Sequence, residues 1–114
     1  MIAPGEIHLA RFPFGGTTGA KLRPVLLLTG LVGPVPEVLT AYISSVIPGA
    51  LLATDLVLDP AQPEFVGTNL KTVSVLRPHM LATVHQRDVV RYLGFLSTAS
   101  MLEVEARLRI LLNL

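Results

Sequence analysis

The chain has 114 residues, of which 51% are hydrophobic and 15% are charged, and its net charge is +1. This length fits a single domain covering residues 1–114, and the hydrophobic content excludes an intrinsically disordered chain. The absence of cysteine excludes a disulfide scaffold and any cysteine-ligated metal site, and it is consistent with the reducing cytoplasm.

The high hydrophobic content raises the question of a membrane segment. The longest uncharged stretch, Val38–Thr54, is broken by Pro48 and Gly49, whereas a membrane span needs about 20 predominantly apolar residues. The N-terminus carries Glu6 early and has no cationic lead, so a signal peptide is not expected either. We therefore expect a cytoplasmic protein whose excess apolar surface meets another protein, which predicts oligomerisation.

Short runs with the character of β-strands make up most of the chain, separated by proline and glycine. The first run alternates, with Ile7 and Leu9 on one side and Glu6 and His8 on the other, as in a half-buried strand. The predicted strands are Gly5–Arg11, Val25–Leu28, Glu37–Val46, Leu51–Leu58, Thr72–Arg77, Leu81–Val84 and Val90–Leu96, with loops at 12–22 and 60–70. Six or seven short strands predict a mainly β fold, a small barrel of strongly bent antiparallel sheet.

The tail from Ser97 to Leu114 contains no glycine or proline and predicts a C-terminal helix. Ser100 followed by Glu103 fits a capping box, with Ser97 and Thr98 as alternative N-caps. Apolar residues at helical spacing form its core face, namely Met101, Val104, Leu108 and Leu111. Others widen the apolar surface, which we expect to meet a partner subunit, namely Leu102, Ile110, Leu112 and Leu114. Opposite charges one turn apart support the outer face, namely Glu103 with Arg107 and Glu105 with Arg109.

Charge is distributed unevenly along the chain. Residues 1–23 and 71–96 are mainly basic, whereas residues 37–64 carry only acidic charges. If the two basic segments lie side by side, they form a cationic groove on a nearly neutral protein.

Three places in the sequence carry residues suited to phosphate chemistry. Arg23, next to a proline that opens a buried strand, can hold a phosphate bidentately, or it can be an edge residue that keeps the loop soluble. Ser44 and Ser45 end a strand, where hydroxyls either donate to a phosphate or close the strand end. Arg77 and His79 flank a proline, which indicates either a site or a bulge with solvated side chains.

The sequence carries no complete motif for nucleotide binding or for a metal site. Residues 15–21 resemble a phosphate loop only in composition, and no dinucleotide fingerprint is present. The histidines, His8, His79 and His85, have no metal-ligand spacing, so no metal site is predicted. Glu6 and His8 fit the solvated face of the first strand.

Taken in order, these segments resemble the MazF/PemK toxin family of bacterial toxin–antitoxin systems. The most recognisable motif is the Arg-Pro that enters a buried strand, in Lys21–Leu28. The other matching segments are Gly5–Leu9, Phe12-Pro13-Phe14, Ala41–Ser45, Thr54–Leu58, Ser74–Arg77, Leu81–Val84 and Leu93–Ser97. The resemblance covers nearly the whole chain.

This resemblance implies an SH3-like barrel with a C-terminal helix, working as a homodimer that a cognate antitoxin protein inhibits. It also implies cofactor-free, metal-independent cleavage of single-stranded RNA, in which the ribose 2′-hydroxyl attacks the adjacent phosphate. Arg23 would bind the scissile phosphate, Ser44 would hydrogen-bond it, and Arg77 would be a second cation. The remaining residues that we expect to contact substrate are Glu6, Lys21 and Ser45.

The chain departs from the family pattern at two places. Some relatives carry an acidic residue, proposed as general base, where this chain has His79, and some carry a histidine that is absent from residues 15–20. His79 is therefore the candidate base, with a phosphate-binding cation and a bystander as the alternatives. The alternative function is a non-catalytic binding module on the same barrel, either a toxin of a protein target or a decayed nuclease.

Overall fold

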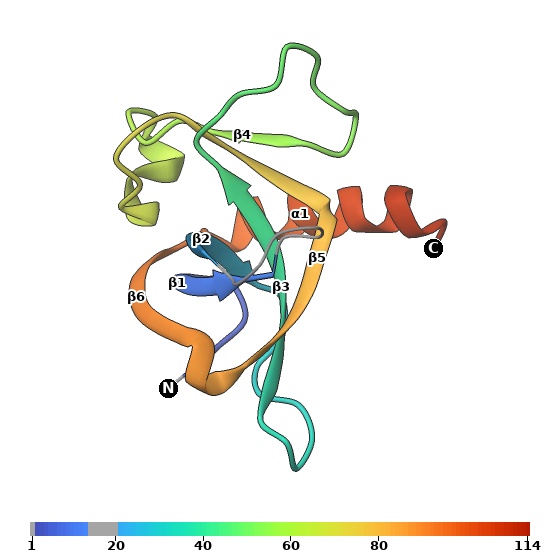
Figure 1. Cartoon of the computed structure of the whole chain (residues 1–114). Helices are drawn as coiled ribbons and strands as arrows, with labels where there is room; N and C mark the ends of the chain where they lie inside the picture. Colours follow the sequence, from blue (N-terminus) through green and yellow to red (C-terminus); the bar gives the residue numbers. More distant parts are fainter. Residues whose placement is uncertain (1, 14–20) are drawn as a thin grey trace.

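The computed structural model describes residues 2–13 and 21–114, and within them the chain forms one curled antiparallel sheet and a terminal helix (Figure 1). The sheet is six-stranded, in the order β4-β5-β3-β2-β1-β6. The strands are β1 (Glu6–Phe12), β2 (Lys21–Leu27), β3 (Glu37–Ser44), β4 (Leu56–Leu58), β5 (Ser74–His85) and β6 (Val89–Phe95). The helices are the 3₁₀ helices η1 (Pro63–Thr68) and η2 (Gln86–Asp88) and the α-helix α1 (Thr98–Leu112). The predicted mainly β fold, a bent antiparallel barrel-like sheet with a C-terminal helix, is confirmed.

Alternation along the strands gives each face of the curled sheet its own apolar cluster. One face carries Ile7, Leu26 and Ile43, against which α1 packs Val104. The opposite face carries a second cluster, namely Ala10, Phe12, Val25, Leu27, Val38 and Val84. Because the sheet is apolar on both faces, polar side chains that serve a site are left mainly at the strand ends.

The two predicted strands around Pro78 are one continuous strand, β5. Tyr42 of β3 pairs with Arg77, but the preceding residue, Ala41, pairs with Leu81. The residues between them form a bulge, since proline has no N–H to donate to the ladder. A bulge is therefore present at this place, but its side chains are not all solvated, since Arg77 forms an ion pair with the buried Asp55.

Two predicted strands are shorter than the sequence pattern indicates. β3 ends at Ser44 because its Oγ accepts a hydrogen bond from the Val46 N–H and donates one to the Val46 carbonyl, both at 3.1 Å. β4 begins only at Leu56 because the Asp55 carboxylate turns back to accept from the Leu52 N–H at 2.9 Å. Side chain-to-backbone bonds of this kind compete with the sheet ladder.

The structure also differs from both predicted loops. The loop at 60–70 contains η1, and the loop at 12–22 is shorter because β2 begins at Lys21. The segment 15–21, which resembles a phosphate loop in composition, lies outside the described residues except for Lys21. Phe14, the last residue of the Phe12-Pro13-Phe14 match, also lies outside them.

Helix α1 begins after Ser97, whose Oγ accepts from the Ser100 N–H at 3.1 Å. Ser97 is therefore the N-cap, and the capping box headed by Ser100 was wrong. The outer ion pairs are confirmed, at 2.9 Å for Arg107–Glu103 and 3.5 Å for Arg109–Glu105. No helix in the described residues is long and apolar enough to cross a membrane.

The last turns of α1 extend away from the sheet (Figure 1). The four predicted partner-facing side chains are all exposed, namely Leu102, Ile110, Leu112 and Leu114. The helix therefore presents an apolar surface that its own barrel leaves uncovered.

Candidate functional site

A pocket of about 220 Å³ lies where β2 begins and β3 ends, and we call it the Arg23 pocket. Val25 pairs with Tyr42 in the antiparallel ladder, and continuing that register by two residues brings Arg23 to Ser44. The lining residues are Arg23, Pro24, Tyr42, Ile43, Ser44, Ser45, Val46 and Ser74. Three of the predicted site residues, Arg23, Ser44 and Ser45, therefore line one pocket.

Arg23 is half-buried on β2 opposite Ala10 of β1. Its Nη1 donates to the Leu22 carbonyl at 3.1 Å. Tyr42 forms the neighbouring wall, and its ring packs against Phe12 with 5.2 Å between the ring centroids. Arg23 and Tyr42 both line the pocket, and a guanidinium in such a place suits an anion with paired acceptor oxygens.

Ser44 and Ser45 differ in what their hydroxyls do. The buried Ser44 hydroxyl already bonds the Val46 backbone twice, as the strand-end interpretation predicts. Ser45 is exposed. A phosphate contact by Ser44 stays a prediction, and it would compete with the turn that this hydroxyl closes.

Arg77 lies outside the pocket lining and forms an ion pair with a buried carboxylate. Its Nε and Nη2 donate to the two carboxylate oxygens of Asp55 at 3.1 and 3.3 Å. The Asp55 side chain is 0% exposed and that of Arg77 is 21% exposed. The charge of Arg77 is thus compensated within the chain, so its role as a substrate-binding cation stays a prediction.

The electrostatics of Asp55 follow from these contacts. Burial raises the pKa of its carboxyl, but hydrogen bonds from Arg77 and the Leu52 N–H, with the charges of Arg77 and His79, outweigh burial. The net pKa lies below the ordinary value of 3.8. Asp55 therefore stays ionised through the neutral range and acts as a fixed counter-ion.

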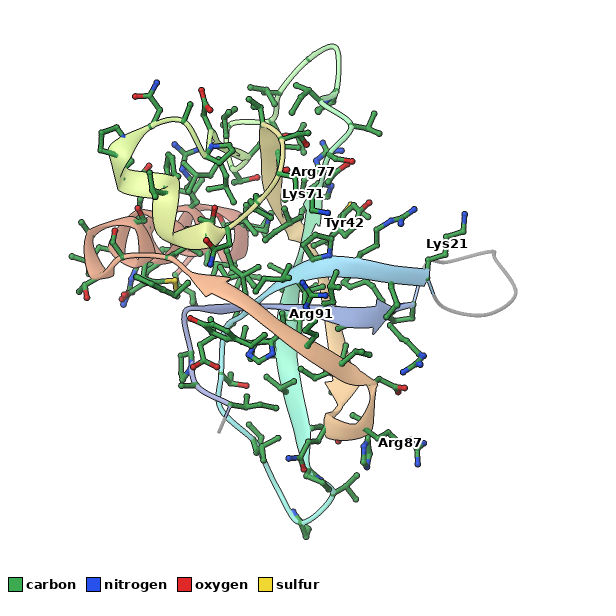
Figure 2. All side chains as sticks on the ribbon, turned by 90° about the vertical axis from the view of Figure 1, so that its left-hand side faces the viewer. Lys21, Tyr42, Lys71, Arg77, Arg87 and Arg91 are labelled. Atoms are coloured by element: carbon green, nitrogen blue, oxygen red, sulfur yellow. The ribbon has the colours of Figure 1, made fainter. Side chains whose placement is uncertain are left out.

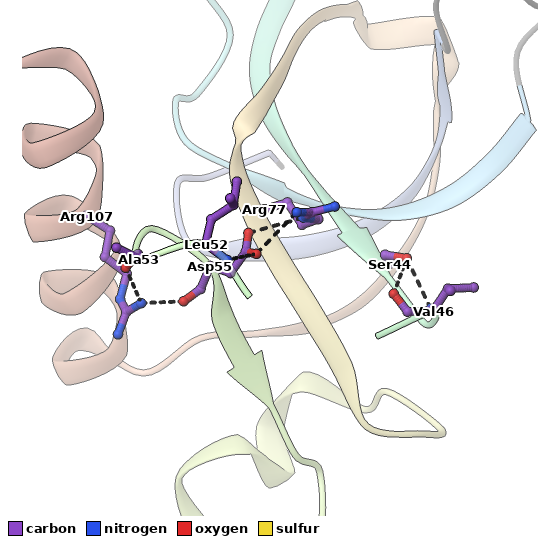
Figure 3. A network of polar contacts seen from close by, with 7 residues as sticks. All are labelled: Ser44, Val46, Leu52, Ala53, Asp55, Arg77 and Arg107. Atoms are coloured by element: carbon purple, nitrogen blue, oxygen red, sulfur yellow. Dashed lines mark hydrogen bonds and ion pairs between the residues drawn. The ribbon is translucent and has the colours of Figure 1, made fainter. Parts of the chain in front are cut away.

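Helix α1 joins the same network through Arg107 (Figure 3). Its Nε donates to Glu103 at 2.9 Å. Its Nη1 donates to the Ala53 carbonyl at 3.1 Å and to the Asp55 carbonyl. We call Asp55, Arg77 and Arg107 the Asp55 cluster, which ties the segment before β4 to β5 and to α1.

The other predicted site residues do not line the Arg23 pocket. His79 is exposed on the β5 bulge, near enough to Asp55 for its charge to lower the pKa of that carboxyl. Glu6 accepts from the Ala3 N–H at 3.2 Å and contacts His8 Nε2 at 3.0 Å. Glu6 lies four residues along β1 from the partner of Arg23, roughly 13 Å away.

Lys21 is exposed at the start of β2, two residues before Arg23 and on the same face. Sequence reasoning missed two polar side chains of the lining, Tyr42 and Ser74. Strand alternation places Tyr42 on the Ser44 side of β3, and this signal could have found it. Among the described residues, no three histidine or carboxylate side chains come together as metal ligands.

Comparisons with known proteins agree with this fold. Residues 3–112 match the family model of the PemK-like, MazF-like toxins of type II toxin–antitoxin systems. No curated protein sequence matches the chain significantly.

Solved structures are similar over nearly their whole length. The Mycobacterium tuberculosis toxin MazF-mt6 is 24% identical, with 96% of this chain and 97% of that chain covered and a TM-score of 0.72. MazF from Deinococcus radiodurans is 17% identical, with 99% and 97% covered and a TM-score of 0.71. An endoribonuclease from a mycobacterial species, solved with its cognate antitoxin, is 15% identical, with 100% and 97% covered and a TM-score of 0.69. Because the family model spans nearly every residue, the chain belongs to the PemK/MazF-like toxin family of type II toxin–antitoxin systems.

Proposed function

We propose that this toxin is a metal-independent endoribonuclease that cleaves single-stranded RNA at the Arg23 pocket. The observation that carries the proposal is the meeting of Arg23, Ser44 and Ser45 in one pocket. A forked guanidinium beside hydroxyl donors suits a phosphodiester, whose charged oxygens accept several hydrogen bonds. The family membership and a relative described as an endoribonuclease support the same reaction class.

The reaction is an internal transfer at phosphorus. The ribose 2′-oxygen forms a bond to the adjacent phosphorus and loses its proton to water, while the bond to the 5′-oxygen breaks and that oxygen gains a proton. Arg23 holds the non-bridging oxygens and stabilises the charge that develops on them. Ser45 donates to the same phosphate, and Ser44 holds the strand end that positions both.

The same proposal includes a homodimer in the cytoplasm, inhibited by a cognate antitoxin. The exposed apolar residues at the end of α1 support a subunit contact, because such patches in small proteins mark interfaces. A relative has been solved with its antitoxin. An acidic, disordered antitoxin tail with apolar anchors would suit a cationic groove. Sedimentation at micromolar concentration should show a dimer, and a stable monomer would contradict this part.

The experiment is cleavage of a single-stranded RNA by the purified chain in the presence of EDTA. We expect products that end in a 2′,3′-cyclic phosphate and a 5′-hydroxyl. Products with 5′-phosphate ends, or activity that EDTA removes, would contradict the mechanism. Absence of cleavage across a varied RNA pool, with RNA or a protein still bound, would favour the non-catalytic binding module.

A further inference from the structure

A second pocket lies beside the Arg23 pocket, between β6 and the segment 69–72 that follows η1. Its volume is about 300 Å³, and we call it the Lys71 pocket. Pro24, Ser45 and Ser74 line both pockets. The two pockets are therefore neighbouring parts of one groove, and Ser45 is one of the residues that they share.

Two local features hold segment 69–72 against β6. Asn69 adopts the left-handed conformation with φ 55° and donates from Nδ2 to the Leu93 carbonyl at 2.7 Å. Gly94 allows β6 to pass close under η1, because a Cβ there would lie 2.3 Å from the Gly67 carbonyl oxygen. The wall that carries Lys71 is thus fixed by backbone contacts.

The lining of the Lys71 pocket combines an apolar floor with cations. Leu9 and Leu93 come from paired strands, and Leu70 lies on the opposite wall. Lys71 and Arg91 are exposed in the same pocket, and Figure 2 shows how they lie in the fold. Within residues 2–13 and 21–114, no carboxylate lines this pocket or pairs with either cation.

The size and chemistry of the pocket favour one nucleotide. Its volume is at the lower end of small-molecule pockets, which span roughly 300–1,000 Å³. Aliphatic walls can hold the faces of a base, as apolar side chains do in sites that take up an unstacked base. Lysine and arginine without carboxylate partners are suited to a backbone phosphate.

We propose that the Lys71 pocket seats the nucleotide adjacent to the scissile phosphate, with its base on Leu9 and Leu93, while Lys71 and Arg91 bind the next phosphate of the strand. The proposal rests on the proposed function, because cleavage at the Arg23 pocket defines which phosphate is the scissile one. It makes these two cations substrate-positioning residues that act away from the reacting atoms.

The first test measures binding without cleavage, using an RNA with a 2′-deoxyribose at the cleaved nucleotide. We expect Lys71→Ala and Arg91→Ala each to raise Kd about five- to tenfold. Each should also reduce the slope of log K against log salt concentration by about 0.7, the value for one lost phosphate contact on a single strand. Arg87→Ala is the matched control, since Arg87 is an exposed arginine that lines neither pocket and lies apart from Lys71 (Figure 2).

A second arm tests the base. An abasic ribose next to the scissile phosphate should weaken binding to the wild-type protein about tenfold on one side of the cleaved bond only, since lost base stacking commonly costs that much. Unchanged affinity with both abasic RNAs, or equal weakening with both, would overturn the base seat.

These outcomes separate the two proposals. A wild-type protein that cleaves RNA while Lys71→Ala and Arg91→Ala keep its affinity and salt slope would overturn the Lys71 pocket and leave the nuclease standing. A protein that binds RNA with the expected slopes but never cuts it would overturn the nuclease and leave the binding groove.

Discussion

The Asp55 cluster and the Lys71 pocket use the same kind of side chain in opposite ways. In the cluster, Arg77 and Arg107 donate to a buried carboxylate and to backbone carbonyls. In the pocket, Lys71 and Arg91 face an opening with no carboxylate among its described lining. The counter-ion, more than the cation itself, therefore decides whether a basic residue holds the fold or is available to a ligand.

The largest expected effect is the loss of stability when the cluster loses its carboxylate. Asp55→Ala should lower the free energy of unfolding by on the order of 3–5 kcal/mol, because Arg77 keeps its charge in a mostly buried place without a partner. Urea denaturation measures this, with Lys71→Ala as the control that should change stability by less than about 0.5 kcal/mol. Equal free energies of unfolding for Asp55→Ala and Lys71→Ala would contradict the distinction between a structural Asp55 cluster and a ligand-binding Lys71 pocket.

A smaller effect is expected at the hydroxyl that both closes a strand and lies in the Arg23 pocket. Ser44→Ala should reduce kcat/KM about tenfold, since it removes both hydrogen bonds to the Val46 backbone, each of about 1 kcal/mol, and loosens the strand end that positions Arg23 and Ser45. Ser44→Thr keeps the hydroxyl and should keep most of the activity. If the alanine variant cuts RNA at the wild-type rate, the Ser44 hydroxyl has no part in positioning the reacting phosphate.

The free energy of unfolding at low pH tests the role of Asp55. Its pKa is lowered in the folded state, so its contribution to stability is fully present above the unfolded pKa, about 3.9. That contribution is lost as pH falls through the folded pKa. Unfolding of the wild type should therefore become easier below about pH 4, whereas Asp55→Asn should lack this component. Parallel profiles for the two proteins would contradict the role of Asp55 as a fixed counter-ion.

The smallest expected effect is at His79. His79 lies on the β5 bulge, is exposed and lines neither pocket, which favours the bystander alternative over the predicted general base. His79→Ala should keep kcat/KM within about threefold of wild type, as expected for a residue that takes no part in proton transfer, which is worth 10²–10⁴-fold. A loss of a hundredfold that His79→Asp restores would establish the base role instead.

Much of the fold could be predicted because it depends on local pattern. The alternation of Ile7 and Leu9 with polar neighbours and the solid run Val25–Leu28 both predict strands that the structure contains. The helix followed from spacing and the absence of glycine and proline. The position of the N-cap could not be predicted in the same way, because Ser97 and Ser100 are equally suitable cap residues. In the structure it is the Ser97 hydroxyl that accepts a hydrogen bond from the Ser100 N–H.

The site could be predicted only in part. Arg23 and Ser44 were expected together because the family resemblance orders the strands that carry them. The pairing of Arg77 with Asp55 spans 22 positions, and no local pattern indicates it. The same holds for Lys71 and Arg91, which the sequence places in one basic segment but which share a pocket only because Gly94 lets η1 approach β6.

The most direct measurement of the central claim compares RNA cleavage by Arg23→Ala and Arg87→Ala, with urea denaturation of both variants. We predict that Arg23→Ala loses at least about a hundredfold in kcat/KM, the usual loss for one donor to the transition-state charge, while its unfolding midpoint stays that of the wild type. Arg87→Ala should match the wild type in both measurements. Equal cleavage by the two variants would contradict the assignment of the Arg23 pocket as the site of reaction.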